Sequence, residues 1–151
     1  RRLENIRTTV YRQTMFASFE REVHKRAAEG GDTTPDGLQA LWYELNRKYY
    51  GPDIVIDEPL KMEWARIPHF YNPFYVYQYA TGFSAATALA QLILKKGAPA
   101  RDRYLEFLSM GGSDYPIELL KNAGVDMSSP KPIKEVVRVF TKTLDEMENL
   151  L

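Results

Sequence analysis

The sequence predicts an all-α protein, and three features of its pattern support that class. Apolar residues recur every three or four positions over most of the chain, which is the spacing of one helix face. Glycines and prolines stand between these periodic segments, where helices end and begin. The sequence has neither a convincing alternating strand pattern nor an internal repeat.

The expected helices number about six, and local signals mark their ends. Thr34 followed by Pro35 reads as an N-cap with proline at the first helical position. Ser113 or Asp114 is expected to cap the fifth helix, and Ser129-Pro130 to open the last, whose apolar stripe extends to Leu151. The expected helices cover residues 3–28, 35–50, 73–96, 99–109, 114–123 and 130–151. Residues 52–72 are expected to form a long, ordered loop, because they are too aromatic for disorder.

The composition excludes several classes of function. The 151 residues carry 20 Lys and Arg against 20 Asp and Glu, so no basic excess favours nucleic acid or an anionic membrane surface. The chain has no cysteine, which removes disulfides, thiol nucleophiles and cysteine-held metals. No secretion signal is recognisable at its start, and a cytoplasmic location is expected.

A stretch of 28 residues, 67–94, contains no Asp, Glu, Lys or Arg. A membrane span is unfavourable, because the stretch includes prolines, glutamines, an asparagine, a histidine and four tyrosines. We expect instead a helix buried on nearly all sides. The other helices of this chain are too few to cover it, so the chain is expected to belong to a larger protein or assembly. Alone it should expose an apolar groove near residues 70–90.

The residues that could take part in catalysis or binding lie at the start of this stretch. His69, Tyr71, Tyr75, Tyr77 and Tyr79 fall within eleven positions. A neutral phenol or an imidazole can donate a hydrogen bond to a carbonyl oxygen or an oxyanion. The competing interpretation is an aromatic core helix whose hydroxyls are satisfied locally.

Other candidate sites are weaker. Glu20 and His24 are four residues apart on the first helix, a spacing that can support a metal, but a solvated helix face explains them better. The charged run Glu20-Arg21-Glu22 is likewise expected to be solvated. The sequence contains no His-Glu-x-x-His, no Gly-rich phosphate loop and no G-x-S-x-G elbow.

Several motifs, in order along the chain, resemble the C-terminal part of oligoendopeptidase F, a relative of thimet oligopeptidase. Together they cover essentially the whole sequence. They are Arg12-Gln13-Thr14-Met15-Phe16, Phe19-Glu20, Trp42, Leu45-Asn46, Tyr49-Tyr50-Gly51, Trp64, Ile67-Pro68-His69-Phe70-Tyr71, Phe74-Tyr75-Val76-Tyr77, Tyr79-Ala80-Thr81-Gly82-Phe83, and Gly112-Ser113 with Pro116 and Leu119-Leu120.

The resemblance implies a helical zinc endopeptidase that cuts short peptides in a deep channel. It places the zinc ligands upstream of Arg1, so this chain is expected to bind no metal and to be inactive alone. It implies that this segment supplies the opposite wall of the site, with His69, Tyr77 and Tyr71 acting on the reacting peptide. Tyr75 and Phe70 are implied to contact substrate, whereas Tyr79 is expected to pack.

Three interpretations stay open. The chain is the C-terminal segment, residues 1–151, of an incomplete peptidase catalytic domain, whose partners are short peptides and the N-terminal part of the same protein. Alternatively it is a stand-alone helical module that binds a helix, a peptide or a second copy of itself through the apolar groove. The third is a complete enzyme with a chemistry that the sequence does not reveal.

Overall fold

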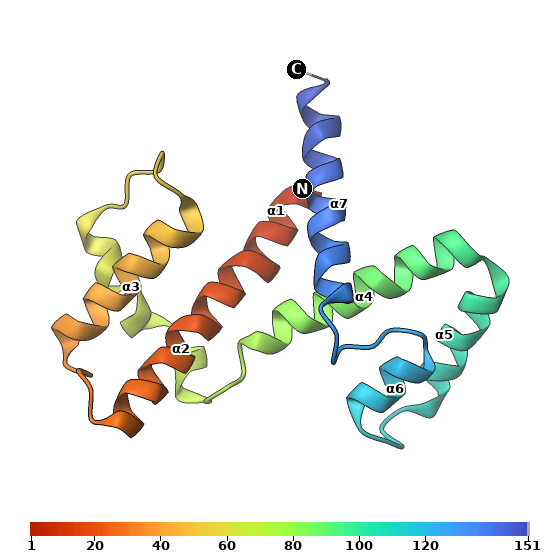
Figure 1. Cartoon of the computed structure of the whole chain (residues 1–151), viewed down its shortest axis with the longest axis horizontal. Helices are drawn as coiled ribbons and strands as arrows, with labels where there is room; N and C mark the ends of the chain where they lie inside the picture. The colour runs from red at the N-terminus through yellow and green to blue at the C-terminus, as the bar shows by residue number, and fades with distance from the viewer. Residues whose placement is uncertain (151) are drawn as a thin grey trace. The chain divides into compact units, whose positions relative to one another are not determined.

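The computed structural model describes residues 1–150 and confirms the all-α class, with no strand in that range. The six predicted helical segments are all present (Figure 1). Leu151, the last residue of the predicted stripe, lies outside the described residues. The elements are α1 (Arg2–Ile6), a π-helical turn η1 (Arg7–Tyr11), α2 (Arg12–Glu29), α3 (Pro35–Tyr50), the 3₁₀ segments η2 (Glu58–Arg66) and η3 (Pro68–Tyr71), α4 (Tyr77–Lys96), α5 (Ala98–Met110), α6 (Pro116–Asn122) and α7 (Lys131–Glu148).

The chain folds into two compact units. One unit is Arg7–Ala80, and the other combines Arg1–Ile6 with the chain from Thr81 on. Helix α4 contributes its first turn to the former and the rest of its length to the latter. The sequence-based candidates His69, Phe70, Tyr71, Tyr75 and Tyr77 all belong to the unit Arg7–Ala80.

The core of the Arg7–Ala80 unit is aromatic. Helices α2 and α3 form an antiparallel hairpin, and η2 packs against α3 (Figure 1). Trp42 is fully buried, with Phe16 and Phe19 at ring-centroid distances of 5.2 and 4.9 Å. Such pairs add about 0.5–1.5 kcal/mol each beyond the apolar area they bury. The returning segment closes this core with Ile67 and Val76, which are also buried.

Local signals explain the ends of α3. The hydroxyl of Thr34 accepts a hydrogen bond from the Gly37 backbone N–H at 3.2 Å, which confirms the predicted cap. Helix α3 ends at Gly51, whose φ of +84° favours glycine.

Helix α6 differs from the prediction: its N-cap is Tyr115, because Pro116 takes the first helical position. Asp114 instead accepts the N–H of Tyr115.

The first predicted helix is interrupted. A π-helical turn, Arg7–Tyr11, separates α1 from α2. A π-turn holds an extra residue, so the single stripe expected over residues 3–28 changes register there. Helix α1 packs against α7, whereas α2 packs against α3.

Helix α4 begins later than predicted. It starts at Tyr77 rather than near Pro73, because Phe74 has a φ of +60°, which no α-helix permits. This chain alone does not cover the helix on all sides, as the sequence analysis expected. One face, with Gly82, Ala86 and Ala90 at intervals of four, is exposed, and Ser84 and Ala85 are buried.

This face of α4 forms part of an apolar groove in the unit that contains Thr81 onward. The groove has a volume of about 500 Å³, and none of its lining residues is charged. The inner side of the same helix packs on a small core made of Ala85, Leu89, Ala123 and Val125. Helices α5 and α6 also line the groove, through Tyr104 and Phe107 of α5 and Leu119 and Leu120 of α6. None of the helices within residues 1–150 is long and apolar enough to span a bilayer.

Candidate functional site

The candidate site is the segment from Ile67 to the first turn of α4. Ile67 and Val76 are buried and anchor its two ends in the aromatic core. Between these anchors the chain turns through η3, which Pro68 opens, and presents polar aromatic side chains on the surface. Val76 and Ala80 are buried, whereas the rings of Tyr75 and Tyr79 contact each other outside the core.

His69, Tyr75 and Tyr79 form one cluster. Nε2 of His69 lies 3.2 Å from the Tyr79 hydroxyl, and the imidazole tautomer decides which group donates. The ring of Tyr75 stacks on the imidazole, with centroids 5.9 Å apart and planes 22° apart. Tyr75 and Tyr79 meet edge to face at 5.5 Å. The three rings therefore fix one another's orientation on the surface of this unit.

The cluster favours the neutral form of Tyr79. Hydrogen bonding to Tyr75, with smaller effects of desolvation and the tyrosinate charge, raises the pKa of the Tyr79 phenol above its ordinary value. Tyr79 therefore keeps its proton, and so its capacity to donate, further into alkaline solution than an isolated tyrosine.

The other sequence-based candidates differ in exposure. The side chain of Tyr71 is 86% exposed, and that of Tyr77 is 50% exposed at the first position of α4. Phe70 lies against the core, with its ring 5.4 Å from that of Phe19 and 5.8 Å from that of Phe16. Phe70 thus holds η3 in place. Tyr71 and Tyr77 face outward, and His69 and Tyr75 are partly exposed beside them.

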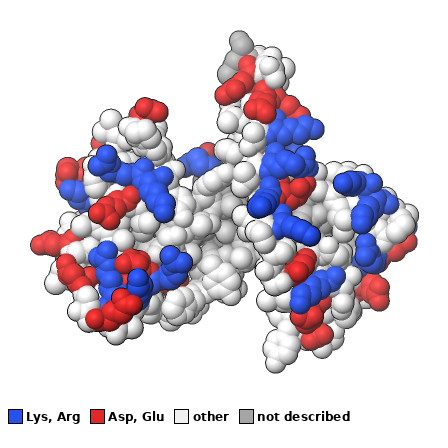
Figure 2. Space-filling model, viewed as in Figure 1, with Lys and Arg blue, Asp and Glu red and all other residues white. Residues whose placement is uncertain are grey.

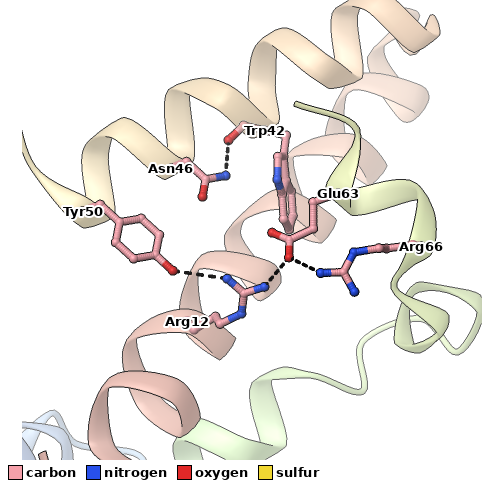
Figure 3. Close-up of polar contacts among 6 residues, drawn as sticks. All are labelled: Arg12, Trp42, Asn46, Tyr50, Glu63 and Arg66. Carbon is pink, nitrogen blue, oxygen red and sulfur yellow. Dashed lines mark hydrogen bonds and ion pairs between the residues drawn. The ribbon is translucent and has the colours of Figure 1, made fainter. Parts of the chain in front are cut away.

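A buried ion pair supports the segment from the side of η2. Figure 3 shows Glu63 accepting from Arg12 at 2.6 Å and from Arg66 at 2.7 Å through the same carboxylate oxygen. Arg12 also donates to the Tyr50 hydroxyl at 3.2 Å. Burial alone would lower the pKa of Arg12, but the hydrogen bonds to Tyr50 and Glu63 outweigh it and raise the pKa. Arg66 directly precedes Ile67, so this network fixes where the candidate segment begins.

The residues present do not fit a zinc site. Zinc needs three or four His, Cys, Asp or Glu ligands converging on one point, and no such group of three occurs within the described residues 1–150. Nε2 of His69 pairs with Tyr79. The sequence analysis expected Glu20 to be solvated, and this is wrong. Its side chain is buried and accepts a hydrogen bond from the Phe74 N–H.

Comparison with known proteins identifies the family. The model of peptidase family M3 matches residues 1–139, which is most of the chain. The chain belongs to peptidase family M3.

Relatives of this M3 segment carry oligopeptidase names. It is 57% identical to oligopeptidase PepF of Bacillus subtilis and 43% identical to the chromosomal oligoendopeptidase F of Lactococcus lactis, in both cases over 99% of this chain. The fold matches the crystal structure of oligoendopeptidase F from Enterococcus faecium over 98% of the chain, with a TM-score of 0.95 and 46% identity. These matches cover only 22%, 25% and 28% of the respective relatives, so the M3 segment spans about a quarter of their length.

The structure adds two residues that the sequence analysis did not place at the site. Tyr79 was expected to pack; its ring does contact His69 and Tyr75, and its hydroxyl in addition lies 3.2 Å from Nε2 of His69. The spacing of four between Tyr75 and Tyr79 was the available signal, because in the helix expected from residue 73 it would put both phenols on one face. Glu20 reaches the site from α2, 54 positions before Phe74, and no sequence signal indicates that contact.

Proposed function

We propose that this chain is the C-terminal segment of a zinc-dependent M3 oligoendopeptidase that hydrolyses internal bonds of short peptides. The segment supplies one wall of the active site, and the zinc ligands lie in the part of the protein outside residues 1–151. The names of the relatives, oligopeptidase and oligoendopeptidase, support the substrate class. A cysteine-free chain accords with a cytoplasmic location.

The observation that carries this proposal is the His69–Tyr75–Tyr79 cluster on an outward-facing segment of an M3 chain. A surface of phenols and an imidazole, pre-oriented by ring contacts, can donate hydrogen bonds to an oxygen as negative charge develops on it. In this proposal His69, Tyr75 and Tyr77 contact the reacting peptide, and Tyr71 contacts substrate further out. Tyr79 keeps the imidazole of His69 in one orientation, and Phe70 holds η3 against the core.

Peptide cleavage by the full-length enzyme tests the proposed wall. Loss of one oxyanion donor typically lowers kcat by about 10²–10³-fold. His69→Ala and Tyr77→Phe should each lower kcat by such a factor, while zinc content measured by mass spectrometry stays at the wild-type value. Loss of zinc together with activity would show that these residues serve the metal site instead. The isolated chain 1–151 should show no turnover with or without added zinc, and measurable turnover would favour a complete enzyme.

The apolar groove is proposed to receive a helix from the rest of the same polypeptide. About three quarters of the length of these relatives lies outside the part that this segment matches. The small side chains of Gly82, Ala86 and Ala90 would let another helix backbone approach closely, and the uncharged lining matches an apolar helix face. On the face drawn in Figure 2, Lys and Arg lie among Asp and Glu on each unit.

Thiol labelling distinguishes the possible occupants of the groove. Ala86→Cys should react with a maleimide in the isolated segment and be protected in the native full-length enzyme. Ala98→Cys, an exposed position outside the groove lining, should react in both. Protection that depends on protein concentration would indicate a second copy, and protection that appears only with peptide would indicate substrate or an interaction module. Either outcome would contradict the proposed occupant.

A further inference from the structure

A buried carboxylate on α2 holds the backbone of the candidate segment. Glu20 is only 6% exposed, and its Oε1 accepts a hydrogen bond from the Phe74 N–H at 2.8 Å. Hydrogen bonds to a carboxylate are about twice as strong as those between neutral groups. Glu20 therefore ties a surface loop to a helix that lies 54 residues earlier in the chain.

The residue that Glu20 holds is strained. Phe74 has a φ of +60°, and within the described residues it is the one non-glycine residue with positive φ. The left-handed conformation is unfavourable for an L-residue and persists only where the surroundings impose it. The Phe74 ring also lies on His24, with centroids 4.7 Å apart. His24 is one helical turn after Glu20, so α2 holds both the backbone and the ring of Phe74.

The strained turn directs the next residue. Tyr75 follows Phe74 directly, and the next residue, Val76, is fully buried. The left-handed turn at Phe74 therefore sets the direction in which Tyr75 leaves the backbone, and Tyr75 stacks on His69. We infer that Glu20 is a positioning residue for the M3 reaction. It acts through Phe74 to hold Tyr75 against His69. This inference rests on the proposed function of the cluster.

Two substitutions at Glu20 in the full-length enzyme test the inference. Glu20→Gln keeps a side-chain oxygen that can accept from the Phe74 N–H, whereas Glu20→Met keeps the length and removes the acceptor. We expect Glu20→Met to lower kcat by about 10–100-fold, because misplacing a reacting group by about 1 Å can cost 10²-fold. Glu20→Gln should stay within about threefold of wild type. Zinc content should be unchanged in both.

A double variant separates positioning from a structural role. If Glu20 acts through Tyr75, adding Tyr75→Phe to Glu20→Met should lower kcat little further, because the two changes remove the same contribution. Losses that multiply in the double variant would overturn the inference. Wild-type kcat in Tyr75→Phe would refute the proposed wall itself. A strong effect of Tyr75→Phe beside a silent Glu20→Met would refute only the positioning role.

Two further measurements keep the inference testable if Glu20→Met does not fold. Phe74→Gly retains the N–H and adopts positive φ without strain, so it should lower kcat less than Tyr75→Phe does. An equal or larger loss would assign the role to the Phe74 ring rather than to Glu20. In the wild-type enzyme, hydrogen exchange should show protection of the Phe74 amide despite the exposure of its side chain. Exchange of that amide at the unprotected rate would overturn the inference.

Discussion

Nε2 of His69 and the hydroxyl of Tyr79, ten residues apart, lie 3.2 Å from each other. The contact joins the 3₁₀ turn η3 to the first turn of α4 within one compact unit. A tyrosine hydroxyl can donate to or accept from an imidazole nitrogen, so the contact holds the ring of His69 in either neutral tautomer. Tyr79 thus helps to fix the orientation of the His69 ring in the cluster.

The first prediction concerns this pair. Tyr79→Phe removes the hydroxyl and keeps the ring, so the edge-to-face contact with the Tyr75 ring survives while the hydroxyl's interactions with His69 and Tyr75 are lost. One such bond contributes about 0.5–1.5 kcal/mol, and we expect kcat to fall by about tenfold, less than for His69→Ala. Steady-state cleavage of a fluorogenic peptide by the full-length enzyme measures this. Tyr43→Phe on α3, outside the cluster, is the matched control and should behave as wild type. Equal kcat in Tyr79→Phe and wild type would show that the hydroxyl of Tyr79 does not orient His69 for the reaction.

The second prediction is a pH dependence. Hydrogen bonding to Tyr75 raises the pKa of Tyr79 in the folded protein. The stability that this contributes is fully present below the unfolded-state pKa of about 10 and is lost as pH rises through the folded value. Spectroscopic tyrosinate titration of wild type minus Tyr79→Phe should therefore show a phenol that titrates above pH 10. Tyr75→Phe should return that transition toward the ordinary value. A difference curve centred at or below the ordinary value would contradict the proposed contact.

Local sequence signals were sufficient for much of the fold. The start of α3 follows from Thr34 and Pro35, because capping and a preset φ act within a few residues. The small, uncharged face of α4 was likewise visible as composition, and the expected apolar groove is present in the structure. These features depend on neighbours in sequence, which a pattern reports directly.

The remaining features depend on contacts distant in sequence. The late start of α4 comes from a carboxylate, Glu20, that holds Phe74 in a left-handed conformation. A charged residue on a helix surface resembles any solvated position until its partner is known. The same holds for Phe70, whose packing on Phe16 and Phe19 cannot be distinguished in sequence from an outward-facing aromatic residue.

The third prediction concerns the buried ion pair of η2. Glu63→Gln leaves Arg12 partly buried without its counter-charge, and we expect a loss of about 2–4 kcal/mol in the free energy of unfolding. Glu58→Gln in the same 3₁₀ segment is the control. Its carboxylate is 79% exposed and pairs with Lys61, so it should change stability by less than about 0.5 kcal/mol. Urea unfolding of both variants measures the difference. Similar values for the two variants would show that the Arg12–Glu63 pair does not hold η2.

The most direct measurement of the central claim compares catalysis with binding of a tetrahedral analogue. A phosphinic peptide carries two oxygens on a tetrahedral phosphorus in place of the scissile carbonyl, so groups that stabilise the intermediate should also bind this inhibitor. We would determine Ki and kcat/KM for His69→Ala, Tyr75→Phe, Tyr77→Phe and Tyr79→Phe in the full-length enzyme. We predict that Ki rises in proportion as kcat/KM falls, with zinc content constant. An inhibitor affinity that stays at the wild-type value while kcat/KM falls would contradict it.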